Sequence, residues 1–164
     1  MQKITTFLWF NGNAEEAANV YTSIFKNSKI LDVGRYGDAG PGPKGSVMIV
    51  KFQLAGQEFI ALNGGPEFKF TEAISLMVNC ENQQEIDELW RKLTAGGGSE
   101  SQCGWLKDKF GLSWQVVPAE IGQLLSAKDP ARSNRVMQAV LSMKKIDIAT
   151  LKRAAEGKEP AFSR

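Results

Sequence analysis

Three polar residues interrupt apolar segments of this 164-residue sequence: Thr6, Ser75 and Gln115. Hydroxyl and amide side chains donate and accept hydrogen bonds without carrying charge, so they suit recognition of a small molecule. They suit equally a buried polar network that water completes. The sequence leaves both interpretations open.

Asn63 and Trp105 complete the set of candidate ligand-binding residues. Asn63 stands directly before Gly64-Gly65, where it either faces the same ligand or stabilises the turn through its own backbone. Trp105 offers a flat aromatic surface that either packs in a core or lines a pocket. We therefore expect a cleft that combines a few uncharged polar groups with aromatic surface.

The sequence contains no histidine. This excludes Ser-His-Asp and Cys-His catalysis, and it excludes metal sites that depend on imidazole. The two cysteines, Cys80 and Cys103, form no CxxC motif, which argues against a disulfide framework or a structural zinc site. Glu58 and Asp108 remain as candidates for a magnesium or manganese site, but solvated turn charges are the favoured interpretation. We expect no metal and no cofactor.

An internal repeat indicates how these residues are positioned. Residues 4–25 and 73–94 share a pattern at an offset of 69 positions. In each copy an apolar run precedes an asparagine that is followed three residues later by a glutamate: Asn13 with Glu16, and Asn82 with Glu85. This spacing resembles a capping box, and apolar residues then recur at i, i+3, i+4 and i+7. The repeat predicts a strand and an amphipathic helix in each half.

Further strands follow each predicted helix, over residues 29–36, 47–54 and 58–62 in the first half and 104–107 and 113–117 in the second. The segment 37–45 (GDAGPGPKG) reads as a mobile loop and a candidate lid. Helices are expected over 120–126, 131–143 and 148–155, with Asp129-Pro130 at the start of the middle one. The sequence thus predicts a single α+β domain over 1–164: βαβββ modules at 1–70 and 71–118, then a helical C-terminal extension at 119–164.

Composition limits the partners and the location. Lysine and arginine number 20 against 18 acidic residues, a net charge of +2 that gives no support to a nucleic-acid partner. No apolar run reaches the roughly 18 residues of a membrane span, and the N-terminal residues lack the pattern of a signal peptide. We expect a cytoplasmic protein that binds no membrane.

Four stretches cover nearly the whole chain: FLWFNGNAEEAANVYTSIF, GQEFIALNGGPEF, CGWLKDKFGLSWQVVP and RVMQAVLSMKKIDIATLKRA. They resemble the PhnB-like family, also named 3-demethylubiquinone-9 3-methyltransferase, within the vicinal oxygen chelate superfamily. The resemblance implies tandem βαβββ modules around a cleft and a homodimer. It also implies a divalent metal held by His and Glu side chains from the first and last strands of each half.

The superfamily's metal-binding positions fall on Thr6, Ser75, Gln115 and Ile60, or on Ala61 if the first half slips by one residue. None of these is a histidine or a carboxylate, so the usual metal site does not carry over. The leading hypothesis is therefore metal-independent binding of a small molecule in the cleft between the modules, as in drug-sequestering resistance proteins of the superfamily.

Two alternatives from the enzyme class stay open, and whether any reaction is catalysed is undecided. One is a lyase, isomerase or dioxygenase that uses a nonstandard divalent metal site. The other is methyl transfer, as the family name states. The glycine-rich segment 37–45 argues against the common S-adenosylmethionine fold, because its two prolines remove backbone donors and no helical pattern follows.

Overall fold

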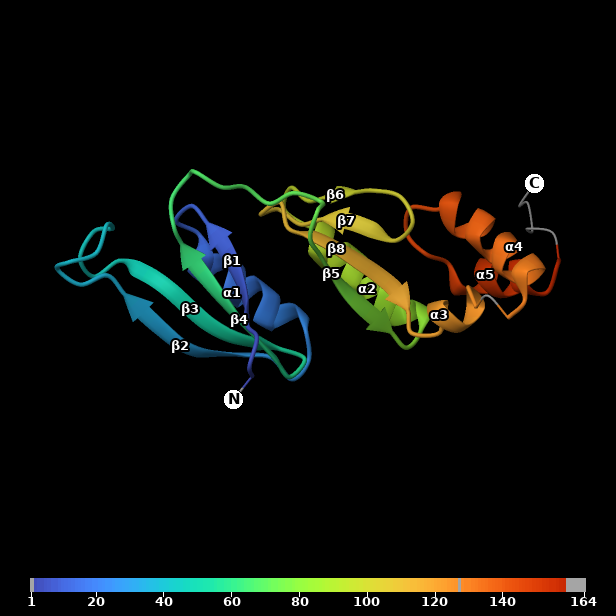
Figure 1. Ribbon diagram of the computed structural model, residues 1–164, viewed down its shortest axis with the longest axis horizontal. Helices are drawn as coiled ribbons and strands as arrows, with labels where there is room; N and C mark the ends of the chain where they lie inside the picture. The colour runs from blue at the N-terminus through green and yellow to red at the C-terminus, as the bar shows by residue number, and fades with distance from the viewer. Residues whose placement is uncertain (1, 127, 159–164) are drawn as a thin grey trace. The chain divides into compact units, whose positions relative to one another are not determined.

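The computed structural model describes residues 2–126 and 128–158 of the chain. The chain forms two compact units, Met1–Phe70 and Thr71–Arg164, and each is built on a four-stranded sheet (Figure 1). Within the described residues, no helix has the length and apolar character that crossing a membrane requires.

The first unit follows the predicted order of one helix among four strands. Its elements are β1 (Thr6–Phe10), α1 (Ala14–Ile24), β2 (Lys29–Arg35), β3 (Val47–Leu54) and β4 (Gln57–Asn63). The strands lie in the order β1-β4-β3-β2, with β1 parallel to β4 and the other pairs antiparallel. Alternation along β1 and β4 turns Leu8, Phe10 and Phe59 toward α1, where Tyr21 is fully buried. This face of the sheet is the core of the unit.

The second unit repeats the same arrangement. Its elements are β5 (Ser75–Cys80), α2 (Gln83–Thr94), β6 (Ser99–Glu100), β7 (Trp105–Lys107) and β8 (Ser113–Pro118). The order is β5-β8-β7-β6, and β5 runs parallel to β8. Trp114 and Val116 of β8 are buried with Ile86 and Leu93 of α2. The α+β prediction with two βαβββ modules is confirmed, although the short strand β6 was not predicted.

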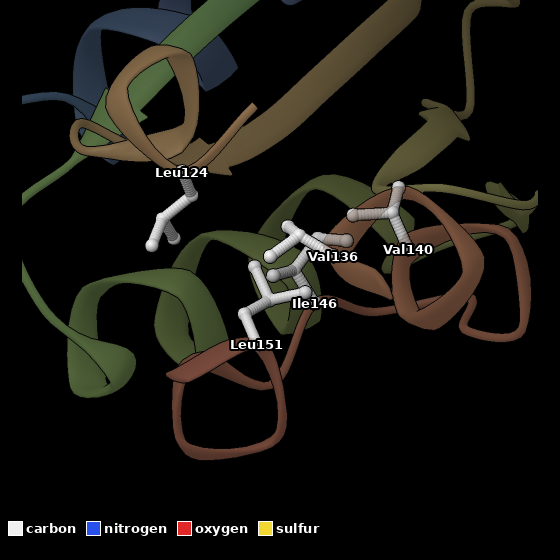
Figure 2. Close-up of a cluster of buried hydrophobic side chains, with 5 residues drawn as sticks. All are labelled: Leu124, Val136, Val140, Ile146 and Leu151. Carbon is white, nitrogen blue, oxygen red and sulfur yellow. The ribbon is translucent and has the colours of Figure 1, made fainter. Parts of the chain in front are cut away.

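Three helices follow β8: α3 (Ile121–Leu124), α4 (Pro130–Leu141) and α5 (Ile148–Ala155). Buried side chains of these helices, together with Ile146 from the α4–α5 connection, form a small hydrophobic cluster, shown in Figure 2: Leu124, Val136, Val140, Ile146 and Leu151. As predicted, α4 begins at Asp129-Pro130, where the Asp129 side chain accepts a hydrogen bond from the backbone N–H of Arg132 at 3.0 Å.

The two long sheet-covering helices begin in different ways. Asn82 Oδ1 accepts from the N–H of Glu85 at 3.0 Å, as the capping pattern predicts. Asn13 makes no such side-chain bond at the start of α1. Instead, Asn63 Oδ1 accepts from the N–H of Ala14 at 2.9 Å. The capping prediction for Asn13 is therefore wrong, because a residue at the end of β4 supplies the acceptor.

The segment 37–45 is packed against Tyr36. The N–H of Tyr36 donates to the carbonyl of Ser46 at 2.9 Å, and the N–H of Gly45 donates to the carbonyl of Tyr36 at 2.8 Å. A Cβ atom at Gly40 or Gly42 would lie 2.5 or 2.4 Å from the Tyr36 ring, so only glycine allows this approach. The structure therefore shows the loop folded against Tyr36 of its own unit, and its expected role as a lid stays a prediction.

The number of residues that separates equivalent positions of the two units is different for the strands and for the helices. The last strand residue before the helix is Phe10 in one unit and Cys80 in the other, an offset of 70, whereas the helices begin at Ala14 and Gln83, an offset of 69. The β1–α1 connection therefore holds one residue more than the β5–α2 connection, and it contains Gly12 at φ +91°. This difference reverses the facing of β1 relative to the prediction.

Candidate functional site

The face of the second sheet that is turned away from α2 carries a row of three side chains. Gln115 of β8 pairs in register with Met77 of β5 on one side and with Trp105 of β7 on the other. Residues paired in register project to the same face of a sheet. An amide thus lies between a thioether and an indole ring, and the Met77 side chain is 55% exposed.

Polar groups surround this row. Gln115 Nε2 donates to Ser75 Oγ at 2.9 Å. Ser113 pairs in register with both Ser75 and Lys107, so its side chain lies on the same face. Ser113 is only 1% exposed, and within the described part of the chain its Oγ has no hydrogen-bond partner. We call this set the Gln115 patch: Ser75, Met77, Trp105, Lys107, Ser113 and Gln115.

Sequence analysis missed Ser113 although a signal for it exists. It stands two residues before Gln115 in the same strand, and strand residues two apart share a face. A buried hydroxyl without a partner costs about 1–3 kcal/mol.

The charges of the patch balance. Lys107 Nζ forms an ion pair with a carboxylate oxygen of Glu72. The hydrogen bond from Lys107 lowers the pKa of the Glu72 carboxyl below its usual value. Because the one lysine of the patch is paired with an acid, the patch favours an uncharged ligand over an anion.

Ser75, Trp105 and Gln115 are thus brought together, but Thr6 is placed elsewhere. Thr6 pairs in register with Phe59, on the face of the first sheet that packs against α1. The expectation that Thr6 is the counterpart of Ser75 is wrong, because the longer β1–α1 connection aligns Thr6 with Leu76 instead.

Asn63 is also on the helix-covered face, where both ends of its amide are used. Oδ1 accepts from the N–H of Ala14, and Nδ2 donates to the carbonyl of Val47 at 3.0 Å. Asn63 therefore connects the start of α1 with β3 and β4. The expected bond within its own turn is not among these contacts. Asn63 also lines a cavity together with Gly64 and Gly65, and its role in ligand contact stays a prediction.

The face of the first sheet that is turned away from α1 shows which residue of β4, Ile60 or Ala61, lies at the position that binds metal in the superfamily. Ile60 pairs in register with Phe7, whose side chain is 59% exposed, whereas Ala61 is fully buried. Ile60 is therefore the residue on the uncovered face, as the count from the turn glycine predicts. An aliphatic side chain at this position offers no atom to a metal ion.

The two carboxylates considered as metal ligands have other surroundings. Glu58 is exposed at the start of β4. Asp108 is 5% exposed; Oδ1 accepts from the N–H groups of Phe110 and Leu112 at 2.9 and 3.1 Å, and Oδ2 accepts from Trp114 Nε1 at 2.9 Å. Asp108 therefore holds the turn before β8 and is not the solvated charge that we expected.

The residues present do not fit the divalent metal of the superfamily. Over residues 2–126 and 128–158, no group of three or more histidine, cysteine, aspartate or glutamate side chains is arranged to hold a metal ion. The positions implied by the resemblance carry a hydroxyl, an amide and an aliphatic group at Ser75, Gln115 and Ile60. These are poor ligands for the metals concerned.

The two βαβββ units have the glyoxalase/bleomycin-resistance fold. The fosfomycin resistance protein FosX of Listeria monocytogenes shares this fold at a TM-score of 0.51 and 16% identity, over 73% of this chain and 94% of that one. A protein of Pseudomonas aeruginosa reaches 0.59 at 22% identity, over 72% of this chain and 98% of that one.

The chain belongs to the family described as 3-demethylubiquinone-9 3-methyltransferase, whose model matches residues 2–117. A solved structure described as a putative 3-demethylubiquinone-9 3-methyltransferase, the PhnB protein of Bacillus cereus, is 44% identical. The match covers 71% of this chain and 99% of that one, with a TM-score of 0.65. A search of curated proteins gives no match. The PhnB-like resemblance is confirmed, and α3, α4 and α5 lie beyond the residues that the family model matches.

Proposed function

We propose that this protein is a cytoplasmic binding protein that takes up a small, uncharged, flat molecule at the Gln115 patch without using a metal. The observation that carries the proposal is the row formed by Met77, Gln115 and Trp105 across three neighbouring strands. An indole and a thioether on either side of an amide suit a ring that carries a carbonyl or hydroxyl group.

The hydrogen-bonding capacity of the patch supports the same conclusion. Gln115 uses Nε2 to donate to Ser75, and its amide also has an oxygen that accepts hydrogen bonds. Ser75 Oγ accepts that bond, so the Ser75 hydroxyl can still donate its own hydrogen. A ligand with one carbonyl and one hydroxyl group would find both a donor and an acceptor.

A quinone or quinol is the first ligand to test, because the family name refers to a demethylated ubiquinone. Isothermal titration calorimetry with a soluble benzoquinone, in buffer containing EDTA, should show saturable binding. Gln115→Leu should weaken it about tenfold, since it removes the central hydrogen bond. Gln138→Leu, a matched change on an exposed face of α4, should leave the affinity unaltered.

The same titrations decide between binding and the two enzymatic alternatives. Binding that requires added Mn²⁺ would overturn the metal-independent proposal and favour a chelate enzyme. Saturable binding of S-adenosylmethionine would favour methyl transfer. The segment 37–45, the one glycine-rich candidate for holding that cofactor, connects the antiparallel strands β2 and β3. It therefore lacks the parallel strand and following helix of the common methyltransferase fold.

We further propose that the protein is a homodimer. The edge strand β1 carries a large apolar side chain outside the Gln115 patch, Phe7, which is 59% exposed. Edge strands with exposed apolar residues are surfaces that a second chain can cover. Light scattering coupled to size-exclusion chromatography should give twice the 18.0 kDa chain mass, and a monomer at micromolar concentration would overturn this proposal.

A further inference from the structure

A cavity of about 430 Å³ opens in the first unit, where three connections meet. It lies among the residues before and within the first turn of α1, the 37–46 segment, and Gly64-Gly65 after β4. We propose that this cavity binds a small protonated amine with an apolar body, held by the carboxylate of Glu15. The lining contains no residue of the Gln115 patch. This proposal can therefore be tested independently of the function proposed above.

The walls of the cavity are mainly apolar. They include the Tyr36 ring, Pro41, Pro43 and Val47. The volume is within the range of small-molecule pockets. An aromatic ring in the lining suits a flat hydrocarbon group. An apolar body in the ligand would therefore find matching surface.

Most polar groups around the cavity are already bonded within the protein. The Tyr36 hydroxyl donates to the carbonyl of Asn63 at 2.7 Å, and the Ser46 hydroxyl donates to the carbonyl of Pro43 at 2.6 Å. These bonds leave few neutral groups that could recognise a ligand. The charge of the lining therefore decides whether the cavity prefers a cationic, neutral or anionic ligand.

Glu15 is the one charged residue among the described residues that line the cavity. Its side chain is exposed, and within the described residues it forms no ion pair. A single carboxylate in a mainly apolar lining that contains no lysine or arginine attracts an ammonium group and repels a carboxylate or phosphate.

Hydrogen bonds fix the frame of the cavity before any ligand arrives. Asn63 joins the start of α1 to β3 through its bonds to Ala14 and Val47. Tyr36 is bonded to Ser46 and Gly45 at the base of the loop. A preformed cavity loses little conformational freedom on binding, which favours measurable affinity for a small ligand.

Benzylamine is a suitable probe, and benzyl alcohol and benzoate are its neutral and anionic counterparts of nearly the same shape. Each is titrated into the full-length ¹⁵N-labelled chain while the amide signals of Gly12, Gly42, Gly64 and Gly65 are followed by NMR. Benzylamine should shift these signals saturably and bind at least fivefold more tightly than benzyl alcohol, and benzoate should leave them unmoved.

Two matched variants locate the charge that matters. Glu15→Gln should weaken benzylamine binding about fivefold, whereas Glu16→Gln, on the same turn but outside the lining, should leave it unchanged. Asn11→Phe should block binding by filling the cavity, and the amide spectrum of each variant shows whether it is folded. Equal binding of benzylamine and benzyl alcohol, no shift at the four glycines, or equal effects of the Glu15 and Glu16 variants would each overturn the proposal.

Discussion

Asn63, the last residue of β4, caps helix α1 from 49 positions away: its Oδ1 accepts a hydrogen bond from the backbone N–H of Ala14 at 2.9 Å. The same amide donates to the carbonyl of Val47. One side chain thus satisfies an unpaired donor at the helix start and fixes the ends of two strands against it. The helix is positioned by the sheet that it covers.

Asn63→Ala should reduce the free energy of unfolding by about 1–3 kcal/mol, because it removes the helix cap and the bond to β3 together. Urea denaturation followed by circular dichroism measures the change. Asn13→Ala is the matched control and should cost much less, since Asn13 makes no side-chain capping bond. Equal losses for the two variants would show that Asn63 is not the effective cap.

Asn13 and Asn63 also show which features of a helix start can be predicted from the sequence and which cannot. The Asn-x-x-Glu pattern marks both helix starts correctly, because apolar periodicity and capping residues are local signals. It names the wrong capping side chain at α1, since the acceptor comes from a strand that is distant in sequence. The α5 cap, by contrast, is local, and Asp147 Oδ1 accepts from the N–H of Thr150.

Asp108→Asn should destabilise the protein by about 1–3 kcal/mol, although the volume hardly changes. The carboxylate accepts from two backbone N–H groups and from Trp114 Nε1. An amide that keeps the backbone bonds would turn its NH₂ group toward the indole N–H, so two donors would face each other.

A double-mutant cycle with Trp114→Phe tests this account of Asp108. Once the indole donor is gone, Asp108→Asn should cost clearly less than it does in the unmodified protein. Unfolding in urea, followed by circular dichroism, gives the four free energies. Purely additive effects would contradict the proposed bond between the two side chains.

The two cysteines should differ in reactivity. Burial, reinforced by the nearby Glu85 carboxylate, raises the pKa of the Cys80 thiol to about 12, so almost no thiolate forms at pH 8. Cys80 is also 1% exposed, whereas Cys103 is partly accessible. Iodoacetamide at pH 8 should modify Cys103 alone, and mass spectrometry should detect a second adduct only after urea is added. Labelling of Cys80 in the folded protein would contradict the burial.

Asp147 should make stability depend on pH in the acid range. Hydrogen bonds from Thr150 hold the pKa of the Asp147 carboxyl below its usual range. A lowered folded-state pKa means that this stabilisation is complete above the ordinary pKa of an aspartate and is lost as the pH falls through the lower value. Asp147→Ala should therefore cost about 1 kcal/mol at pH 7 and less near pH 3. Urea titrations at both values measure the difference, and a constant cost would contradict it.

The candidate site was predictable only in part, and the reason is strand parity. Counting from the turn glycine finds Gln115, and the repeat finds Ser75, because the two strands of the second unit keep the expected alternation. The prediction for Thr6 is wrong because it applies the helix offset of 69 to the strand, although the connection near Gly12 contains one additional residue. Ser113 was missed although its position two residues before Gln115 places it on the same strand face; its burial has no signal in the sequence.

The additional residue before α1 shows how the two units of a repeated fold can come to differ in the surface of one strand. A single inserted residue in the turn leaves the helix and the hydrogen-bonded ladder intact while it exchanges the side chains that β1 presents on its two faces. One unit of such a fold therefore presents a different surface when a single turn is one residue longer.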